Sequence, residues 1–350
     1  MAEKSGRQHR TFGGKRMIYR IGSFNVKNLS LATGRDLDRI ASIILENKLD
    51  IVAMQEVLSE GKILTGVNAK SVSGQAKAYD YSLKRRLGKN WDICWRDPET
   101  SAKNYPFLGE DSRGEGYAFL WNTLRVDLPF DEKGSRIYPR IWRNYKTNVD
   151  DGLIRLMRDP CYGRFVTNGR KAEIRLITTH IVYGKPSSDK LDADLDFGAI
   201  KMRNHEFQIL AGQIYPRVSE YYKDINCTVP YTLILGDYNL NLPTREATKS
   251  LMPPIAYFDS RGKKINIEED AACTIYTVQE ELSTLKTSED GLANNYDHFS
   301  FDERVRKQIV PDSARTINAI EQHSKDENSK YDTYRKEVSD HLPIVIEIDI

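Results

Sequence analysis

Residues Tyr231 to Asn239 read Tyr-Thr-Leu-Ile-Leu-Gly-Asp-Tyr-Asn, an apolar run that ends abruptly in polar side chains. A short apolar run followed by glycine and turn formers is typical of a buried β-strand. Asp237 and Asn239 stand two positions apart, so in an extended backbone both side chains project from the same face of the sheet. The run predicts a strand that carries two oxygen-bearing side chains at its end, and an Asx turn that merely ends the strand is the alternative.

Other predicted strands end in the same kind of side chain. Asn25 lies in Ser-Phe-Asn-Val, Glu56 in Met-Gln-Glu-Val, His180 in Thr-Thr-His, and Asp340 with His341 in Ser-Asp-His. Any one of these, taken alone, is more often a turn former or a satisfied hydrogen-bond partner than a catalytic group. Their ordered recurrence along the chain changes that balance, and we expect the strand ends to converge in one site.

The remaining pattern is mixed α/β, because β-rich runs alternate with polar or helical stretches. Apolar residues from Leu37 to Leu45 and from Ala199 to Ile214 recur at helical spacing. The predicted strands comprise Met17 to Val26, Asp50 to Gln55, Tyr117 to Trp121, Ile174 to Ile181, Tyr231 to Leu235, Tyr296 to Phe301 and Pro343 to Ile348. Polar segments interpreted as surface insertions are Leu58 to Lys89, Leu128 to Asp151, Arg245 to Glu289 and Arg304 to Lys336.

The chain of 350 residues is interpreted as one catalytic domain, residues 18–350, behind a flexible basic arm, residues 1–17. Hydrophobic residues make up 39% and charged residues 29%, which is a globular balance. The formal net charge of +2 is far from that of a protein held to nucleic acid by charge alone. The distribution of charge must therefore identify any nucleic-acid surface.

Neither a membrane-spanning apolar run nor an apolar secretory segment is found in the sequence. Its cysteines lack the spacing of a zinc site or a disulfide framework, which suits a reduced compartment. These cysteines are Cys94, Cys161, Cys227 and Cys273. We expect a cytoplasmic protein that acts as a monomer without a membrane partner.

The Asn, Gln-Glu, His, Gly-Asp-x-Asn, Tyr-Asp and Ser-Asp-His-x-Pro motifs occur in the order of the endonuclease/exonuclease/phosphatase superfamily, which the chain resembles from Ile18 to Ile350. The resemblance implies the DNase I-like fold, an α/β (α+β) four-layer sandwich of two mostly antiparallel sheets flanked by helices. It also implies a Mg²⁺- or Mn²⁺-dependent phosphoric diester hydrolase, with an endonuclease favoured. Unlike DNase I, the chain has Arg113 in place of a DNA-contacting tyrosine and Leu58 in place of an arginine, so we expect different minor-groove contacts.

Hydrolysis of a phosphodiester requires charge neutralisation at the phosphoryl oxygens, an oriented water and protonation of the leaving alkoxide. Hard oxygen ligands suit Mg²⁺ or Mn²⁺, and Glu56, Asn25 and Asp340 are the expected metal ligands. By resemblance, Asp237 activates or orients the attacking water. Asn239 is then expected to contact the phosphate or a second metal ion.

Each of the two candidate histidines is expected to pair with a carboxylate. By resemblance, Glu115 partners His180 and Asp297 partners His341, which fixes the tautomer of each imidazole and raises its basicity. One histidine would then protonate the leaving oxygen, while the other binds the phosphoryl group or helps to activate water. Arg158 resembles the arginine that clamps the scissile phosphate, since a guanidinium fork matches phosphate geometry.

The stretch from Arg136 to Lys146 interleaves cations with aromatic residues and is the candidate substrate surface. Such a mixture could follow phosphates and stack bases. An ordinary hairpin whose aromatics cover a sheet and whose arginines are solvated explains it equally well. The residues expected to contact substrate are Arg113, Arg136, Arg140, Trp142 and Arg143.

Together these features favour a nuclease that cuts DNA in preference to RNA and, as the resemblance implies, leaves 5′-phosphate and 3′-hydroxyl ends. Phosphatases and lipid diesterases share the same catalytic strand ends, so an enzyme acting on inositol-phosphate or lipid phosphoesters is the alternative. A catalytically inactive binding module is the second alternative, which the full set of candidate ligands and histidines disfavours. Strand preference, endonucleolytic or exonucleolytic action and the biological role stay open.

Overall fold

The structure is a computed structural model of the chain. It describes residues 17–58, 62–65, 82–96, 115–142, 146–149, 152–156, 158–169, 172–181, 199–221, 229–241, 257–258, 264–265, 275–323 and 330–350. The predicted basic arm, apart from its last residue, and the candidate substrate residues Arg113 and Arg143 lie outside these described residues.

Sheet A has six strands in the described part of the chain. Its central pair, β1 with β2, is parallel, and all its other pairs are antiparallel. In order across the sheet, the strands are β16 (Arg315–Thr316), β17 (Ile344–Asp349), β1 (Ile18–Leu29), β2 (Ile51–Leu58), β4 (Glu115–Asn122) and β3 (Trp91–Arg96).

Sheet B has seven strands among the described residues, and again a single pair, β10 with β11, is parallel. In order, the strands are β14 (Ile275–Val278), β15 (Asp297–Asp302), β11 (Val229–Asp237), β10 (Ala172–His180), β9 (Cys161–Thr167) and β5 (Val126–Asp127), with β6 (Arg140–Ile141) also paired to β9. Both sheets are thus mostly antiparallel.

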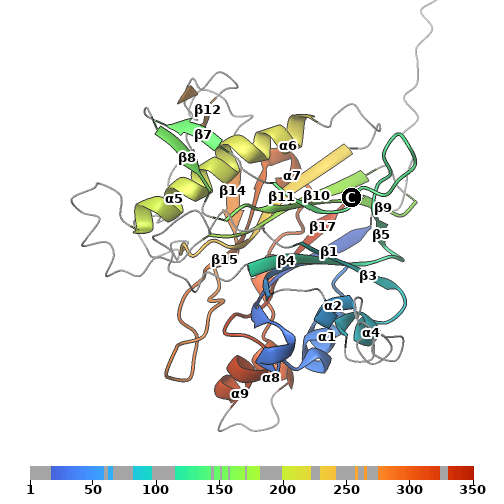
Figure 1. The fold of residues 1–350 in the computed structure, drawn as a ribbon, viewed down its shortest axis with the longest axis vertical. Helices are drawn as coiled ribbons and strands as arrows, with labels where there is room; N and C mark the ends of the chain where they lie inside the picture. Colours follow the sequence, from blue (N-terminus) through green and yellow to red (C-terminus); the bar gives the residue numbers. More distant parts are fainter. Residues whose placement is uncertain are drawn as a thin grey trace, which may run out of the picture.

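Helices cover the outer faces of the two sheets (Figure 1). The side of sheet A carries η1 (Leu31–Thr33), α1 (Leu37–Glu46), α2 (Lys62–Thr65), α4 (Leu83–Leu87), α8 (Ala319–His323) and α9 (Lys330–Glu337). The side of sheet B carries α5 (Ala199–Ile209), the π-helical turn η5 (Leu210–Ile214) and α6 (Tyr215–Tyr221). The remaining elements are α7 (Glu303–Arg306) and two hairpins, β7 (Lys146–Val149) with β8 (Gly152–Arg155) and β12 (Tyr257–Phe258) with β13 (Lys264–Ile265).

The alternation of side chains along each strand separates an inner core from an outer one. On β1, Tyr19 and Ile21 belong to the apolar cluster between the sheets, whereas Phe24 and Val26 belong to the cluster beneath the helices. Period-two alternation requires this division, because successive residues of a strand point to opposite faces. Asn25 follows Tyr19 and Ile21 on the inward face, so this polar strand end points between the sheets.

The predicted four-layer sandwich is confirmed, and so are the predicted strands and helices, with small changes at their ends. Ten of the described strands were not predicted, among them β3, β9 and β14. The segment Arg245 to Glu289, interpreted as a polar surface insertion, contains β12, β13 and β14, and β14 forms the edge of sheet B. β3 and β14 are edge strands, which need less apolar alternation than central strands, so their sequence signal is weak.

Among the described residues, no helix combines the length and apolar character needed to cross a bilayer.

Candidate active site

Three neighbouring strands of sheet B bring the first catalytic candidates together. His180 lies directly beside Asp237 in the parallel pair of β10 and β11, and Asp237 lies directly beside Asp297 in the antiparallel pair of β11 and β15. All three residues are almost completely buried. Gly236 makes this approach possible: its φ is 139°, and an added Cβ would stand 2.0 Å from the carbonyl oxygen of Thr179.

His180 forms the first predicted dyad with Glu115. Its Nδ1 lies 3.0 Å from Glu115 Oε2, and its backbone N–H donates to the hydroxyl of Tyr117 at 3.2 Å. Burial and Arg158 both lower the pKa of His180, but the carboxylates of Glu115 and Asp237 outweigh them, so that this pKa is raised. The dyad therefore favours a protonated imidazole.

His341 forms the second predicted dyad with Asp297. Its Nδ1 lies 2.8 Å from Asp297 Oδ2, which also accepts a hydrogen bond from Ser283 Oγ at 2.7 Å. Burial alone would lower the pKa of His341, but Asp297 and Asp237 raise it to about 10. The two carboxylates therefore favour the protonated imidazole of His341.

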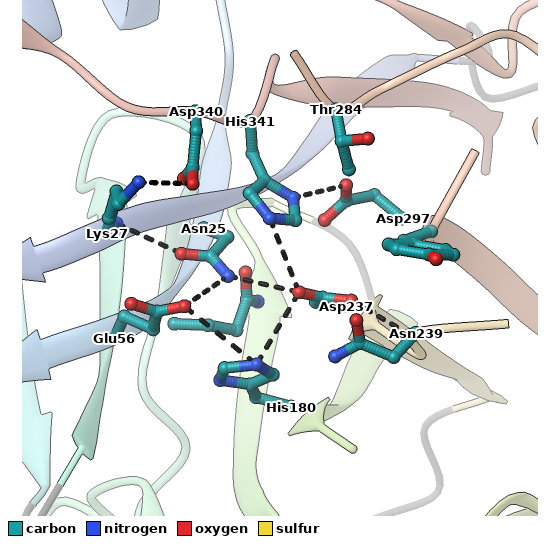
Figure 2. A network of polar contacts seen from close by, with 12 residues as sticks. Asn25, Lys27, Glu56, His180, Asp237, Asn239, Thr284, Asp297, Asp340 and His341 are labelled. Carbon is teal, nitrogen blue, oxygen red and sulfur yellow. Dashed lines mark hydrogen bonds and ion pairs between the residues drawn. The ribbon is translucent and has the colours of Figure 1, made fainter. Parts of the chain in front are cut away.

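Asp237 lies between the two histidines, as Figure 2 shows. Its Oδ2 is 3.5 Å from His180 Nε2 and 3.6 Å from His341 Nε2, while its Oδ1 accepts the backbone N–H of Asn239 at 2.9 Å. Burial raises the pKa of Asp237 to about 6, although both histidines lower it. An acceptor whose pKa lies near neutrality, with a proton donor on each side, is suited to general acid and base catalysis.

Sheet A contributes Asn25 and Glu56 from irregular strand ends. Both β1 and β2 change register here, and Glu56 has a φ of 57°. Asn25 Nδ2 donates to Glu56 Oε1 at 2.9 Å and to Asp237 Oδ2 at 3.1 Å, while its Oδ1 accepts the backbone N–H of Lys27 at 3.0 Å. In this orientation Asn25 links two carboxylates across the sheets, which differs from the oxygen-ligand role predicted for it.

Asp340 was predicted to bind metal, but its carboxylate forms an ion pair with the ammonium group of Lys27 (Figure 2). Burial would raise the pKa of Asp340, whereas His341 and Lys27 hold it below its usual value. Asp340 is therefore a charged carboxylate that already has a cationic partner.

Arg158 lies beside the first dyad. Its Nη2 is 2.8 Å from Glu115 Oε2, and its Nη1 is buried without a hydrogen-bond partner. A buried guanidinium N–H without an acceptor is costly. This geometry leaves a donor for an anionic oxygen next to His180.

Asn239 and Arg203 hold the loop after β11. Asn239, at a φ of 50°, donates through Nδ2 to the carbonyl of Ile181 at 2.8 Å, and its own carbonyl accepts from Arg203 Nη1 at 2.6 Å. Arg203 thus supports this loop. Asn239 fixes Asp237 through its backbone as described above.

The predicted substrate residues that are described do not gather in one place. Arg136 contacts Asp127 and Asp92. Asp92 pairs with Trp121, six positions along β4 from Glu115, or about 20 Å at the rise of a strand. Arg136 therefore lies at the far end of the sandwich, and its predicted contact with substrate at this site is not supported.

Arg140 and Trp142 lie nearer the candidate site. β6 pairs with the first residues of β9, the end next to Arg158, and Trp142 donates its backbone N–H to Pro160 at 2.9 Å. The indole of Trp142 packs edge-on against Tyr162, with ring centroids 6.0 Å apart, and Arg140 stacks over it at 5.9 Å. The half-buried indole thus covers sheet B, and Arg140 is exposed at the edge of this sheet.

Sequence reasoning missed several positioning residues. Ser339 Oγ donates to the carbonyl of Asn25 at 2.7 Å, and Ser283 Oγ supports Asp297 as described above. Ser339 belongs to the Ser-Asp-His motif and could have been found there. Ser283 lies in a segment interpreted as an insertion, and Lys27 lies in a register shift, so neither had a local signal.

Two groups of side chains have the ligand types and spacing to hold a metal ion. In the described part of the chain, these are Glu56, Glu115 and His180, and Asp237, Asp297 and His341, with the ligand atoms of each group within 4.8 Å of one another. Glu115 and Asp297 already contact the Nδ1 atoms of His180 and His341 in the two dyads. The carboxylate of Glu56 accepts hydrogen bonds from two neutral amide donors, with His180 Nε2 3.9 Å from its Oε1, and is the best fit to a hard divalent cation.

No protein-family model and no curated protein matches the chain. Solved structures do match it. An endonuclease/exonuclease/phosphatase family protein from Bacteroides thetaiotaomicron superposes with a TM-score of 0.53 at 12% identity, covering 96% of this chain and 99% of that one. An endonuclease/exonuclease/phosphatase from Bacteroides vulgatus gives a TM-score of 0.50 at 12% identity, covering 95% and 99%. The chain has the fold of this superfamily, and the predicted DNase I-like architecture is confirmed.

Proposed function

We propose that the chain is a divalent-metal-dependent phosphodiesterase that hydrolyses nucleic acid, with DNA preferred to RNA. The observation that carries this proposal is the position of Asp237 between the Nε2 atoms of His180 and His341, each of which contacts a carboxylate through Nδ1. This arrangement supplies a proton acceptor and two donors within one buried cluster of side chains. Phosphodiester hydrolysis needs both functions at once.

The residues of the chain would divide the reaction as follows. Asp237 orients a water, whose oxygen forms a bond to phosphorus as the bond to the leaving oxygen breaks in line. The water proton passes to Asp237, and a protonated histidine gives its proton to the leaving alkoxide. The free Nη1 of Arg158 binds a non-bridging phosphoryl oxygen.

Glu56 would hold Mg²⁺ or Mn²⁺, which when bound neutralises charge on the phosphoryl oxygens. The products would be a phosphomonoester and a free hydroxyl, as a 5′-phosphate and a 3′-hydroxyl on nucleic acid.

The test uses purified protein, His180→Ala and, as control, Asp92→Asn at the far end of sheet A. Each is incubated with supercoiled plasmid, single-stranded DNA, RNA and the chromogenic diester bis(p-nitrophenyl) phosphate, with Mg²⁺, Mn²⁺ or EDTA. Metal-dependent cleavage that His180→Ala loses and Asp92→Asn retains supports the proposal. Hydrolysis of the small diester without cleavage of any polymer would reject nucleic acid as the substrate but leave the phosphodiesterase activity standing. Inositol-phosphate and lipid phosphoesters would then be tested as substrates.

A further inference from the structure

The end of β1 departs from regular pairing beside the candidate active site. Asn25 pairs with Gln55 and Leu29 with Val57, so β1 uses more residues than β2 across the same interval. Lys27 and Asn28 take up the surplus in left-handed conformations, with φ of 38° and 58°. Residues other than glycine avoid this region, and such bulges are found where a side chain must be re-aimed.

The bulge directs Lys27 to Asp340. Figure 2 shows its ammonium group on the Asp340 carboxylate, on the same side of the site as Asn25 and Glu56. The backbone of the bulge also contacts these two residues, because the N–H of Lys27 donates to Asn25 Oδ1 at 3.0 Å and the N–H of Asn28 donates to Glu56 Oε2 at 3.1 Å. These two hydrogen bonds fix the position of the bulge, and with it Lys27, relative to Glu56.

Arg35 fixes the bulge from the other side. It donates to the carbonyl of Lys27 through Nε at 3.2 Å and through Nη2 at 2.8 Å. Its Nη1 donates to the carbonyls of Arg335 and Lys336, each at 2.8 Å. The left-handed conformation of Lys27 is therefore anchored to the end of α9, close in the chain to Asp340.

We infer that Lys27 is a fixed cation that withdraws Asp340 from metal binding, so that the chain binds a single divalent ion, at Glu56, beside the lysine ammonium. The inference rests on the proposed function and deepens it, because it adds Lys27 to the positive charges that would face the scissile phosphate. Asp340 then acts as a positioning residue for Lys27.

Charge and geometry favour this assignment. An ammonium and a divalent ion on one carboxylate would repel each other strongly at partly buried positions. The Lys27 ammonium carries three donors, and its side chain is 35% exposed, which leaves N–H groups for a phosphoryl oxygen. An ordinary surface ion pair would explain the contact alone, but it would leave metal binding unchanged when it is removed.

Mn²⁺ binding measured by electron paramagnetic resonance, with substrate absent, tests the inference. The proteins are the unmodified chain, Lys27→Met, Lys27→Arg, Asp340→Asn and the double variant Lys27→Met with Asp340→Asn. Lys48→Met is the matched control, because Lys48 is an exposed lysine that also has a positive φ, of 53°. Thermal unfolding of each protein verifies that it is folded.

We expect the unmodified chain, Lys27→Arg and Lys48→Met to bind a single Mn²⁺. Lys27→Met should bind a second ion, or bind Mn²⁺ at least about tenfold more tightly than the unmodified chain. The double variant Lys27→Met with Asp340→Asn should lose that gain. Asp340→Asn alone should leave the affinity nearly unchanged, whereas loss of a true ligand would weaken it by at least about tenfold.

Unchanged binding by Lys27→Met, or a large loss in Asp340→Asn, overturns the inference while leaving a metal-dependent site in place. If the unmodified chain binds no Mn²⁺ at Glu56, as judged by Glu56→Gln, the metal dependence in the proposed function fails as well. The two failures are therefore distinguishable. If Lys27→Met does not fold, Asp340→Asn decides the question by itself.

Discussion

His180 and Asp237 are direct neighbours across the parallel pair of β10 and β11, and their side chains approach to 3.5 Å between Nε2 and Oδ2. The same carboxylate lies 3.6 Å from His341 Nε2. One buried carboxylate oxygen thus lies between the two imidazole rings. This relationship makes Asp237 the residue whose change should affect the chemistry most directly.

Replacing Asp237 by asparagine should lower phosphodiester hydrolysis by about 10²-fold to 10⁴-fold, because the amide cannot take a proton from water. The rate with bis(p-nitrophenyl) phosphate at saturating Mg²⁺ measures the effect. Asp127→Asn, at the opposite end of the sandwich, is the matched control and should keep full activity. A decrease of similar size in both variants would point to unfolding and contradict a catalytic role.

The rate should depend on pH in the sense set by Asp237 and His341. Burial raises the pKa of Asp237 to about 6, and a working base must be ionised, so kcat/KM should rise as pH increases through about 6. Burial is outweighed at His341, where Asp297 and Asp237 raise the pKa to about 10, so a proton donor is lost only above that value. A profile of kcat/KM from about pH 5 to about pH 11 tests both limbs. A flat acidic limb would exclude Asp237 as the base.

Gly236→Ala should destabilise the fold by at least about 2–3 kcal/mol. The new methyl group would stand 2.0 Å from the carbonyl oxygen of Thr179, and β10 and β11 would have to separate. Gly134→Ala is the control, because Gly134 also has a positive φ, of 76°, but has no atom near the added Cβ. It should cost about 1–2 kcal/mol for backbone strain alone. Urea unfolding of the two variants measures the difference, and equal losses would refute the steric argument.

The buried cluster of Arg164, Glu173 and Arg175 should make stability sensitive to acid. Arg164 Nε and Arg175 Nε lie 2.6 Å and 2.7 Å from Glu173 Oε1. Burial would raise the pKa of Glu173, but the two arginines lower it below its ordinary value of 4.5. The stabilising contribution of this group is therefore fully present above pH 4.5 and is lost as pH falls towards the depressed pKa.

Glu173→Gln should consequently cost about 3–5 kcal/mol at neutral pH, because two buried guanidinium groups lose their counter-charge. The difference from the unmodified chain should shrink in acid. Glu289→Gln, which removes an exposed partner of Lys286, is the control and should change little. Urea unfolding at neutral and acidic pH measures the difference in free energy of unfolding between Glu173→Gln and the unmodified chain. A difference that is the same at both pH values would contradict the ionic explanation.

The strand ends could be predicted because each carries its signal in consecutive residues. Asp237 and His180 follow apolar runs, where period-two alternation assigns each of them a face, and His341 directly precedes the apolar run of β17. The dyads were predicted through resemblance, since nothing local links Glu115 to His180. Positions governed by tertiary contacts could not be predicted: Lys27 reaches Asp340 through a register shift, and Asn25 turns its amide nitrogen to two carboxylates from different strands.

β17 pairs along almost the whole regular length of β1, yet the two strands are far apart in sequence. During synthesis at about 5–20 residues per second, the roughly 300 residues between them take ~15–60 s to appear. For that time β1 offers the nascent chain, and its neighbours on the polysome, an open hydrogen-bonding edge rich in isoleucine and aromatic residues. Ribosome-associated chaperones, or slower growth at lower temperature, should therefore govern the yield of folded protein more than the stability of the finished sandwich does.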